Sequence, residues 1–372
     1  MTKTKLLYIA NALFPQNSAN RIQVMNVCEA FSENGVDVTL LAFKSPEFSG
    51  NGGLFKRYNI RKKFGLRLLD PPKTYFLRDL RLFFEFRKIH EKYQNVFTRT
   101  SLVAFLIKKF FKNMKVVYEL HDYRKSLLWK RLFKATFNAV DKMVVISNGL
   151  KKELTRRGFD SGKIIVLPDG VNLEKFDIKI SKLQARRKLG LPLDKKMVMY
   201  TGSLQKWKGV NVLLEAFGKI ISENVVLCIV GGSNEEVDAY RSSHADKNII
   251  FTGFQPQNKI PTYLKAADVL ILPNTAKEEI SSKYTSPLKL FEYMASKRPI
   301  IATNLPSIRE NVGKNVAVFS KADSSSDLAG KIDYVLSTAK VSGRLAGCAL
   351  LVVKGFSWKN RSINILDIYG KL

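Results

Sequence analysis

The feature of this sequence that most constrains its fold is a series of short apolar runs separated by stretches with helical periodicity. A strand with one face in water alternates apolar and polar residues, whereas a parallel strand covered by helices on both faces is apolar throughout. These runs are too apolar to alternate, so they predict parallel strands in doubly wound α/β sheets. The first half of the chain holds runs at residues 5–10, 36–43, 96–98, 115–120, 142–146 and 163–167. The second half holds runs at residues 196–201, 225–230, 248–251, 269–272, 299–303 and 316–319.

The strand and helix pattern stops and then begins again, so the 372-residue chain predicts two α/β domains. We expect an N-terminal Rossmann-like domain over residues 1–175 and a C-terminal one over residues 190–356. Between them, a charged and irregular stretch that reaches about residue 195 would be the connection. Two such domains facing each other would leave a central cleft at the carboxyl ends of their strands, where ligands of these sheets bind.

The charge of the chain is unusual. Lys and Arg number 62 and Asp and Glu 32, which gives +30 and predicts a polyanionic neighbour. Residues 54–93 alone hold twelve basic and four acidic residues, interleaved with aromatic and aliphatic ones. That mixture favours a surface that lies on anionic lipid headgroups. A solvated basic face is the alternative interpretation.

The cysteines give no sign of a metal or of disulfides. Cys28, Cys228 and Cys348 are far apart, lie in apolar segments and are odd in number. The N-terminus has no apolar stretch long enough for a signal peptide, and no run approaches the length of a membrane span. We therefore expect a cytoplasmic protein.

The segment Tyr284–Glu310 combines a helix start, a buried strand and a second helix start. We expect Ser286 to be the N-cap and Pro287 the first helical residue. The free N–H groups of such a helix start bind phosphate well. Lys289 and Glu292 lie on a polar stripe of this helix, and the Glu292 carboxylate is suited to accept hydrogen bonds from sugar hydroxyls. An ordinary interior helix with a polar rim fits the same residues.

Two glycine turns follow strands of the second domain. The strand Met197–Gly202 ends in Thr201-Gly202-Ser203, and Lys208 precedes the next helix. Glycine lets a ligand approach the backbone, and lysine supplies a point charge for phosphate. Gly231-Gly232 repeats the turn after the next strand. A plain strand-to-helix turn with a surface lysine is the alternative.

In the first domain, His121 and Asp122 follow the strand at residues 115–120, and Arg99 closes the strand at 96–98. All three are expected at the edge of the cleft. A histidine there can hydrogen-bond a substrate hydroxyl or transfer a proton, and an arginine can contact an anionic substrate. Structural or merely exposed side chains are the alternative.

Taken in order, several segments resemble glycosyltransferase family 4, whose two-domain fold is called GT-B. The second half matches with YTGSLQKWKGVNVLLEAF (200–217), VVLCIVGGS (225–233), IIFTGFQPQNKIPTYLKAADVLILPN (249–274) and SPLKLFEYMASKRPIIATNLPSIRE (286–310). The first half matches with NSANRIQVMNVCEAF (17–31) and VVYELHD (116–122). The final segment, residues 357–372, resembles the family's helix that returns to the first domain.

The resemblance implies transfer of a sugar from a UDP- or GDP-sugar with retained anomeric configuration and without a metal or other cofactor. It implies that Lys208 neutralises the diphosphate and that Glu292 binds the donor ribose. His121 matches a histidine near the acceptor and the donor sugar. The remaining donor contacts would come from backbone groups at Gly202, Gly232, the helix start Ser286–Leu288 and the loop Thr252–Phe254.

The sequence departs from the family pattern at two positions. Ser203 stands where the family often has an arginine, and Tyr284 stands where it has the first of two glutamates eight positions apart. Because of these two departures, the family pattern does not specify which residues contact the hydroxyls of the donor sugar. We interpret the site as a variant one.

The hypothesis is therefore a cytoplasmic glycosyltransferase, peripheral on the inner face of the plasma membrane. It would extend a saccharide, expected to be lipid-linked, of a cell-surface polysaccharide such as lipopolysaccharide or capsule. Three alternatives remain at this stage: a GT-B sugar-nucleotide epimerase, a non-catalytic GT-B protein, and a basic nucleic-acid-binding protein. The last lacks zinc-finger, RNP and helix-turn-helix signals, so no nucleic acid is expected as a partner.

Overall fold

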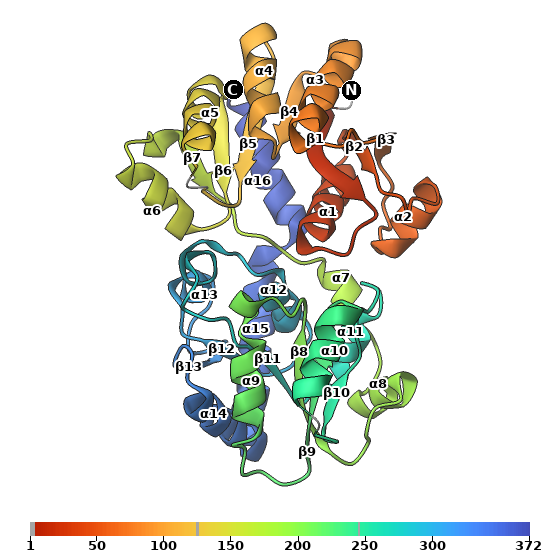
Figure 1. The fold of residues 1–372 in the computed structure, drawn as a ribbon, viewed down its shortest axis with the longest axis vertical. Helices are drawn as coiled ribbons and strands as arrows, with labels where there is room; N and C mark the ends of the chain where they lie inside the picture. Colours follow the sequence, from red (N-terminus) through yellow and green to blue (C-terminus); the bar gives the residue numbers. More distant parts are fainter. Residues whose placement is uncertain (1–3, 124–125, 245) are drawn as a thin grey trace. The chain divides into compact units, whose positions relative to one another are not determined.

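The computed structural model describes residues 4–123, 126–244 and 246–372 (Figure 1). The chain forms two compact units. The first unit comprises Met1–Asp169 together with Trp358–Leu372, and the second comprises Gly170–Ser357. The first unit is therefore built from both ends of the chain.

The first unit contains a seven-stranded sheet in the order β3-β2-β1-β4-β5-β6-β7, and every neighbouring pair is parallel. Its strands are β1 (Lys5–Phe14), β2 (Asp37–Lys44), β3 (Gly65–Leu69), β4 (Asn95–Thr98), β5 (Lys115–Leu120), β6 (Lys142–Val145) and β7 (Ile164–Val166). Its helices are α1 (Ala19–Glu33), α2 (Asn51–Arg57), α3 (Tyr75–Ile89), α4 (Ser101–Phe110), α5 (Leu127–Ala139), α6 (Asn148–Arg156) and α16 (Trp358–Gly370). Helix α16 packs on α1, while α4 lies between α3 and α5.

The second unit contains a six-stranded parallel sheet in the order β10-β9-β8-β11-β12-β13. Its strands are β8 (Lys196–Thr201), β9 (Val225–Val230), β10 (Ile249–Phe251), β11 (Val269–Leu272), β12 (Ile300–Thr303) and β13 (Val318–Ser320). Its helices are α7 (Leu173–Phe176), α8 (Lys182–Leu189), α9 (Val210–Phe217), α10 (Asn234–Ser243), α11 (Ile260–Ala266), α12 (Leu288–Ala295), α13 (Pro306–Arg309), α14 (Ser325–Ser337) and α15 (Ala339–Val353).

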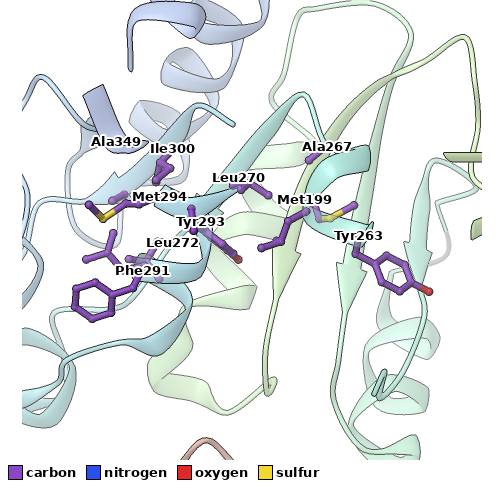
Figure 2. Packing of buried hydrophobic residues seen from close by; sticks show 14 of the residues in the cluster. Met199, Tyr263, Ala267, Leu270, Leu272, Phe291, Tyr293, Met294, Ile300 and Ala349 are labelled. Atoms are coloured by element: carbon purple, nitrogen blue, oxygen red, sulfur yellow. The ribbon is translucent and has the colours of Figure 1, made fainter. Parts of the chain in front are cut away.

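The core of the second unit has two apolar clusters, because successive side chains of each buried strand point to opposite faces of the sheet. Figure 2 shows part of one cluster, in which Phe291, Tyr293 and Met294 of α12 lie near Leu272 of β11. The hydroxyl of Tyr293 accepts a hydrogen bond of 2.8 Å from the backbone N–H of Thr201. This bond fixes α12 against the carboxyl end of β8.

The predicted doubly wound α/β architecture is confirmed, and each predicted strand is present within a few residues. Two local predictions are wrong. The segment expected to be an irregular connection contains α7 and α8, and Ser181 and Gln184 form a capping box at the start of α8. Strand β3 was not predicted, because it is a half-exposed edge strand with Arg67 at its centre and lacks a continuous apolar run.

Helix α16 is held to the first sheet by a buried ion pair. Nη2 of Arg361 donates to Oε2 of Glu119 at 2.6 Å, and the two side chains are 4% and 0% exposed. Nε of Arg361 donates to the carbonyl of Pro168 at 2.9 Å. Burial alone would raise the pKa of Glu119, but the charge of Arg361, the hydrogen bond from His121 and the charge of Arg99 together outweigh it and hold that pKa well below its usual range. Glu119 is therefore ionised inside the protein, and its buried negative charge is stabilised by the side chains that pair with it.

We predict that Arg361→Met strongly destabilises the first unit. Removing one partner of a buried pair leaves an uncompensated charge, which typically costs about 3–5 kcal/mol. Lys359→Met on the same helix is the matched control, because Lys359 is exposed and its hydrogen bonds with Asn34 and Ser362 use its backbone carbonyl. Urea unfolding followed by fluorescence measures both variants. Equal unfolding midpoints for the two variants would contradict the assigned role of the pair.

Candidate functional site

At the carboxyl edge of the second sheet, three glycine-containing loops meet. Gly202 follows β8 with φ +131°, and Gly231 follows β9 with φ +119°. A Cβ on Gly231 would lie 2.2 Å from the carbonyl oxygen of Gly202, so no other residue fits without a backbone shift. The N–H of Gly231 donates to the carbonyl of Gly253, after β10, at 2.9 Å. Close packing of these backbones leaves an edge with few side chains.

Lys208 lies at the end of the loop that follows β8. Its Nζ is 3.4 Å from the centre of the Trp207 ring, a cation–π contact. Burial lowers the pKa of Lys208 to about 7. The next residue, Gly209, has φ +72°, and a Cβ there would lie 1.9 Å from the carbonyl oxygen of Pro273. The loop can therefore pass this close to the end of β11 only with glycine at position 209.

Helix α12 brings Lys289 and Glu292 to the same edge. Oε1 of Glu292 accepts a 2.8 Å hydrogen bond from Nε2 of Gln257, and burial raises the pKa of Glu292. The charge of Lys289 interacts with the charges of both Lys208 and Glu292. The predicted residues Gly202, Lys208 and Glu292 are thus brought together around a lysine.

The predicted capping of α12 is wrong by one residue. The helix begins at Leu288, and Pro287 is the N-cap, with ψ 114° and no side-chain cap. The proline ring fixes φ but not ψ, so Pro287 stays extended and outside the helix. Ser286 precedes the cap and is buried. The helix start expected to bind phosphate therefore begins one residue later than predicted.

The other predicted donor residues lie around this edge in different settings. Ser203 is exposed, and its carbonyl accepts a 2.6 Å hydrogen bond from the Tyr200 hydroxyl. Gly232, with φ +88°, packs against Leu204. Phe254 follows β10 and is 46% exposed. Tyr284, at the expected glutamate position, is 8% exposed.

In the first unit, His121 and Arg99 share one carboxylate. His121 Nε2 contacts Oε1 of Glu119, and Nε of Arg99 lies 3.8 Å from the same oxygen. Burial and the charge of Arg99 lower the pKa of His121 to about 4. His121 is therefore neutral at pH 7 with Nε2–H donating to Glu119, which leaves Nδ1 as an acceptor. Asp122 is exposed and lies outside this group.

Sequence reasoning missed two residues of these groups. Glu119 lies in an apolar strand that read as pure core, although a carboxylate there needs a partner. Lys289 was recognised as part of a polar stripe but was not assigned to the site. In the sequence, the one signal for either residue is a charged side chain within a segment that is otherwise apolar.

Two α/β units, each built on a parallel sheet and with glycine-containing loops at the strand ends of the second, define the GT-B class of fold. Comparisons with known proteins support the same fold class. The family described as Glycosyltransferase Family 4 matches residues 22–175, and the family described as Glycosyl transferases group 1 matches residues 195–338. The chain belongs to this glycosyltransferase family.

Three similar proteins illustrate the relationship. A putative teichuronic acid biosynthesis glycosyltransferase, TuaC of Bacillus subtilis, is 28% identical over 204 residues, which is 54% of this chain and 48% of TuaC. The match thus spans about half the length of that relative. Anabaena HepE in complex with UDP has a TM-score of 0.80 at 17% identity over 99% of this chain and 100% of HepE. The lipopolysaccharide outer core galactosyltransferase WaaB has a TM-score of 0.68 at 18% identity, covering 99% of this chain and 100% of WaaB. The last two likenesses concern the fold.

Within residues 4–123, 126–244 and 246–372, no group of three or more His, Cys, Asp or Glu side chains is arranged to hold a metal ion. In the same residues no single helix is long and apolar enough to cross a membrane, although the pair Ser325–Ser337 and Ala339–Phe356, bent by 98°, passes on length and composition.

We predict that Gly209→Ala destabilises the second unit by more than about 2 kcal/mol. The added methyl group meets the backbone of Pro273, and the residue must keep a left-handed φ. Gly218→Ala, at the other end of α9, is the control, because Gly218 has φ −66° and a Cβ there meets nothing closer than 3.8 Å. Differential scanning calorimetry of both variants is the measurement. A Gly209→Ala protein as stable as Gly218→Ala would show that the loop can relax.

Proposed function

We propose that this protein transfers a sugar from a nucleotide-diphosphate sugar to a saccharide acceptor during synthesis of a cell-surface polysaccharide. One observation carries the proposal: half-buried Lys208, in the loop that follows the Gly202 turn, and the carboxylate of Glu292 on α12 both act electrostatically on Lys289, whose Nζ reaches Gly202. Family membership and the presence of UDP in the HepE structure support a UDP- or GDP-sugar as the donor. The relatives TuaC and WaaB support a polysaccharide or lipopolysaccharide product.

The proposed chemistry follows from where charge develops. As the sugar leaves, negative charge builds on the departing diphosphate, and a preorganised ammonium stabilises it without reorganisation. In this proposal Lys208 supplies that charge, Glu292 accepts from ribose hydroxyls, and no metal takes part. The anomeric configuration is retained, and a departing phosphate oxygen takes the acceptor proton. Nδ1 of the neutral His121 accepts from a sugar hydroxyl.

We predict that Lys208→Met weakens donor binding about 10–100-fold, the cost of losing a charged hydrogen bond. A panel of UDP- and GDP-sugars first identifies the donor by calorimetry on the wild-type protein. Lys277→Met is the control, because Lys277 is exposed on a neighbouring loop. Incubating the donor without acceptor tests the epimerase alternative. Wild-type protein that binds no sugar nucleotide would contradict the proposed function.

The same lysine predicts a pH dependence. With a pKa of about 7 in the free protein, Lys208 is mostly uncharged at pH 8.5 and must take up a proton to bind the diphosphate. Wild-type affinity should therefore fall about 10–30-fold between pH 6.5 and 8.5. In Lys208→Met this fall should be markedly smaller.

We further propose that the first unit lies on the cytoplasmic face of an anionic membrane, where it meets a lipid-linked acceptor. Helix α3 carries an exposed stripe of Leu77, Arg81, Phe84 and Lys88, four positions that share one helical face. Phe110, at the end of the neighbouring α4, is also 62% exposed. Basic side chains between exposed apolar ones favour anionic headgroups. Other aromatic residues of the basic segment, such as Phe83 and Phe86, are buried and do not take part.

The double variant Leu77→Ser with Phe84→Ser should bind vesicles of phosphatidylglycerol and phosphatidylcholine about tenfold more weakly than wild type, because apolar contact area is lost. Ile221→Ser removes an 85% exposed apolar residue of the second unit and is the control. Sedimentation at low and high salt measures binding. No sedimentation of the wild-type protein at low salt would contradict membrane attachment and leave the donor chemistry intact.

A further inference from the structure

Lys289 is a buried ammonium group with no acceptor. The residue is 8% exposed, and its Nζ has no hydrogen-bond partner among the described residues. Its nearest stabilising contact is the ring of Tyr200, whose centre lies 3.8 Å from Nζ. A buried charged group without a hydrogen-bond partner is costly, so native proteins normally pair it.

The position of Nζ shows where a partner would lie. A Cβ built on Gly202 would stand 2.7 Å from Nζ and 3.0 Å from Cε of Lys289. Lys289 therefore reaches the glycine turn after β8, where no side chain intervenes. Two features hold it there: α12 is fixed to β8 through Tyr293 and Thr201, and the Tyr200 hydroxyl ties down the carbonyl of Ser203.

The charges around Lys289 favour an anion over a neutral ligand. Lys208 repels it, and Glu292, the one acidic group among the described residues that attracts it noticeably, already accepts a hydrogen bond from Gln257. A single carboxylate thus faces two lysines. A diphosphate carries enough negative charge to satisfy both, and its several oxygens can accept from each ammonium group.

The geometry points to Lys289 as a second diphosphate-binding residue, which reaches the phosphates of the donor across Gly202 from the side of α12. This inference rests on the proposed function for the identity of the donor, and it adds a residue that the sequence stripe alone did not assign. It also accounts for the turn: a side chain at position 202 would occupy the space between the lysine and the ligand.

A protonation step follows from this assignment. Burial, and next the charge of Lys208, hold the pKa of Lys289 well below its usual range, so this lysine loses its proton more easily in the free protein than an exposed lysine does. A bound diphosphate favours the ammonium form. Donor binding should therefore be coupled to proton uptake, which calorimetry measures as a dependence of the binding enthalpy on the buffer.

The test compares Lys289→Met with wild type and with Lys277→Met. The ligands are UDP and GDP, the nucleosides uridine and guanosine, and inorganic pyrophosphate. We expect the matching nucleoside diphosphate to bind Lys289→Met about 10–100-fold more weakly, with nucleoside binding unchanged. Proton uptake on binding at pH 8 should be smaller in Lys289→Met than in wild type. The melting temperature should stay equal or rise, because a buried unpaired amine is removed.

Each other outcome is decisive. Equal diphosphate affinity in wild type and Lys289→Met overturns the inference and leaves the proposed function standing. Equal loss of nucleoside and diphosphate binding indicates a merely structural lysine and also overturns it. If wild type binds pyrophosphate through Lys289 but binds no nucleotide, the anion site stands and the proposed function fails. If wild type binds none of these ligands, both fail.

Discussion

The close approach of backbone segments at Gly202, Gly231 and Gly253 is the constraint on which the second unit's functional edge depends. A Cβ on Gly231 would collide with the carbonyl of Gly202, so the loops after adjacent strands β8 and β9 can meet only as bare backbone. The three glycines are each partly exposed at this edge and carry no side chain. The lysines then enter from elsewhere: Lys208 from the following turn and Lys289 from α12.

The two units handle buried charge in opposite ways. In the first, the network joins Glu119 of β5 to Arg361 of α16, to His121 just after β5 and to Arg99 just after β4. The charge of Glu119 is thus paired within the unit, which favours rigidity, although Nη1 of Arg361 has no hydrogen-bond partner among the described residues. In the second, Nζ of Lys289 has no hydrogen-bond partner among the described residues, and Lys208 repels it. A carboxylate paired with side chains of the same unit is suited to hold those side chains in position. A buried lysine without an acceptor is suited to bind a negatively charged ligand.

The buried strands were predictable because continuous apolar runs leave few alternatives, and β8, β9 and β11 were placed at their observed bounds. Edge strand β3 was not predicted because a half-exposed strand has no continuous apolar run. Lys208 and Glu292 were recognised as candidates from turn chemistry and from family resemblance, and their roles remain predictions. Lys289 could not be assigned from sequence alone. A lysine on a helix stripe has the same pattern whether it reaches water or is buried without an acceptor, and only packing decides.

The first unit is assembled from both ends of the chain, and this has a consequence for biosynthesis. The chain enters the second unit at Gly170 and leaves it at Ser357, where the N–H of Val171 donates to the carbonyl of Phe356 at 2.9 Å. A ribosome makes Glu119 a full 242 positions before Arg361. The pair between Glu119 and Arg361 therefore cannot form until the segment that contains α16 has been synthesised. The unit that begins first is the last to be completed, and truncation near the C-terminus would damage the domain whose sequence starts the chain.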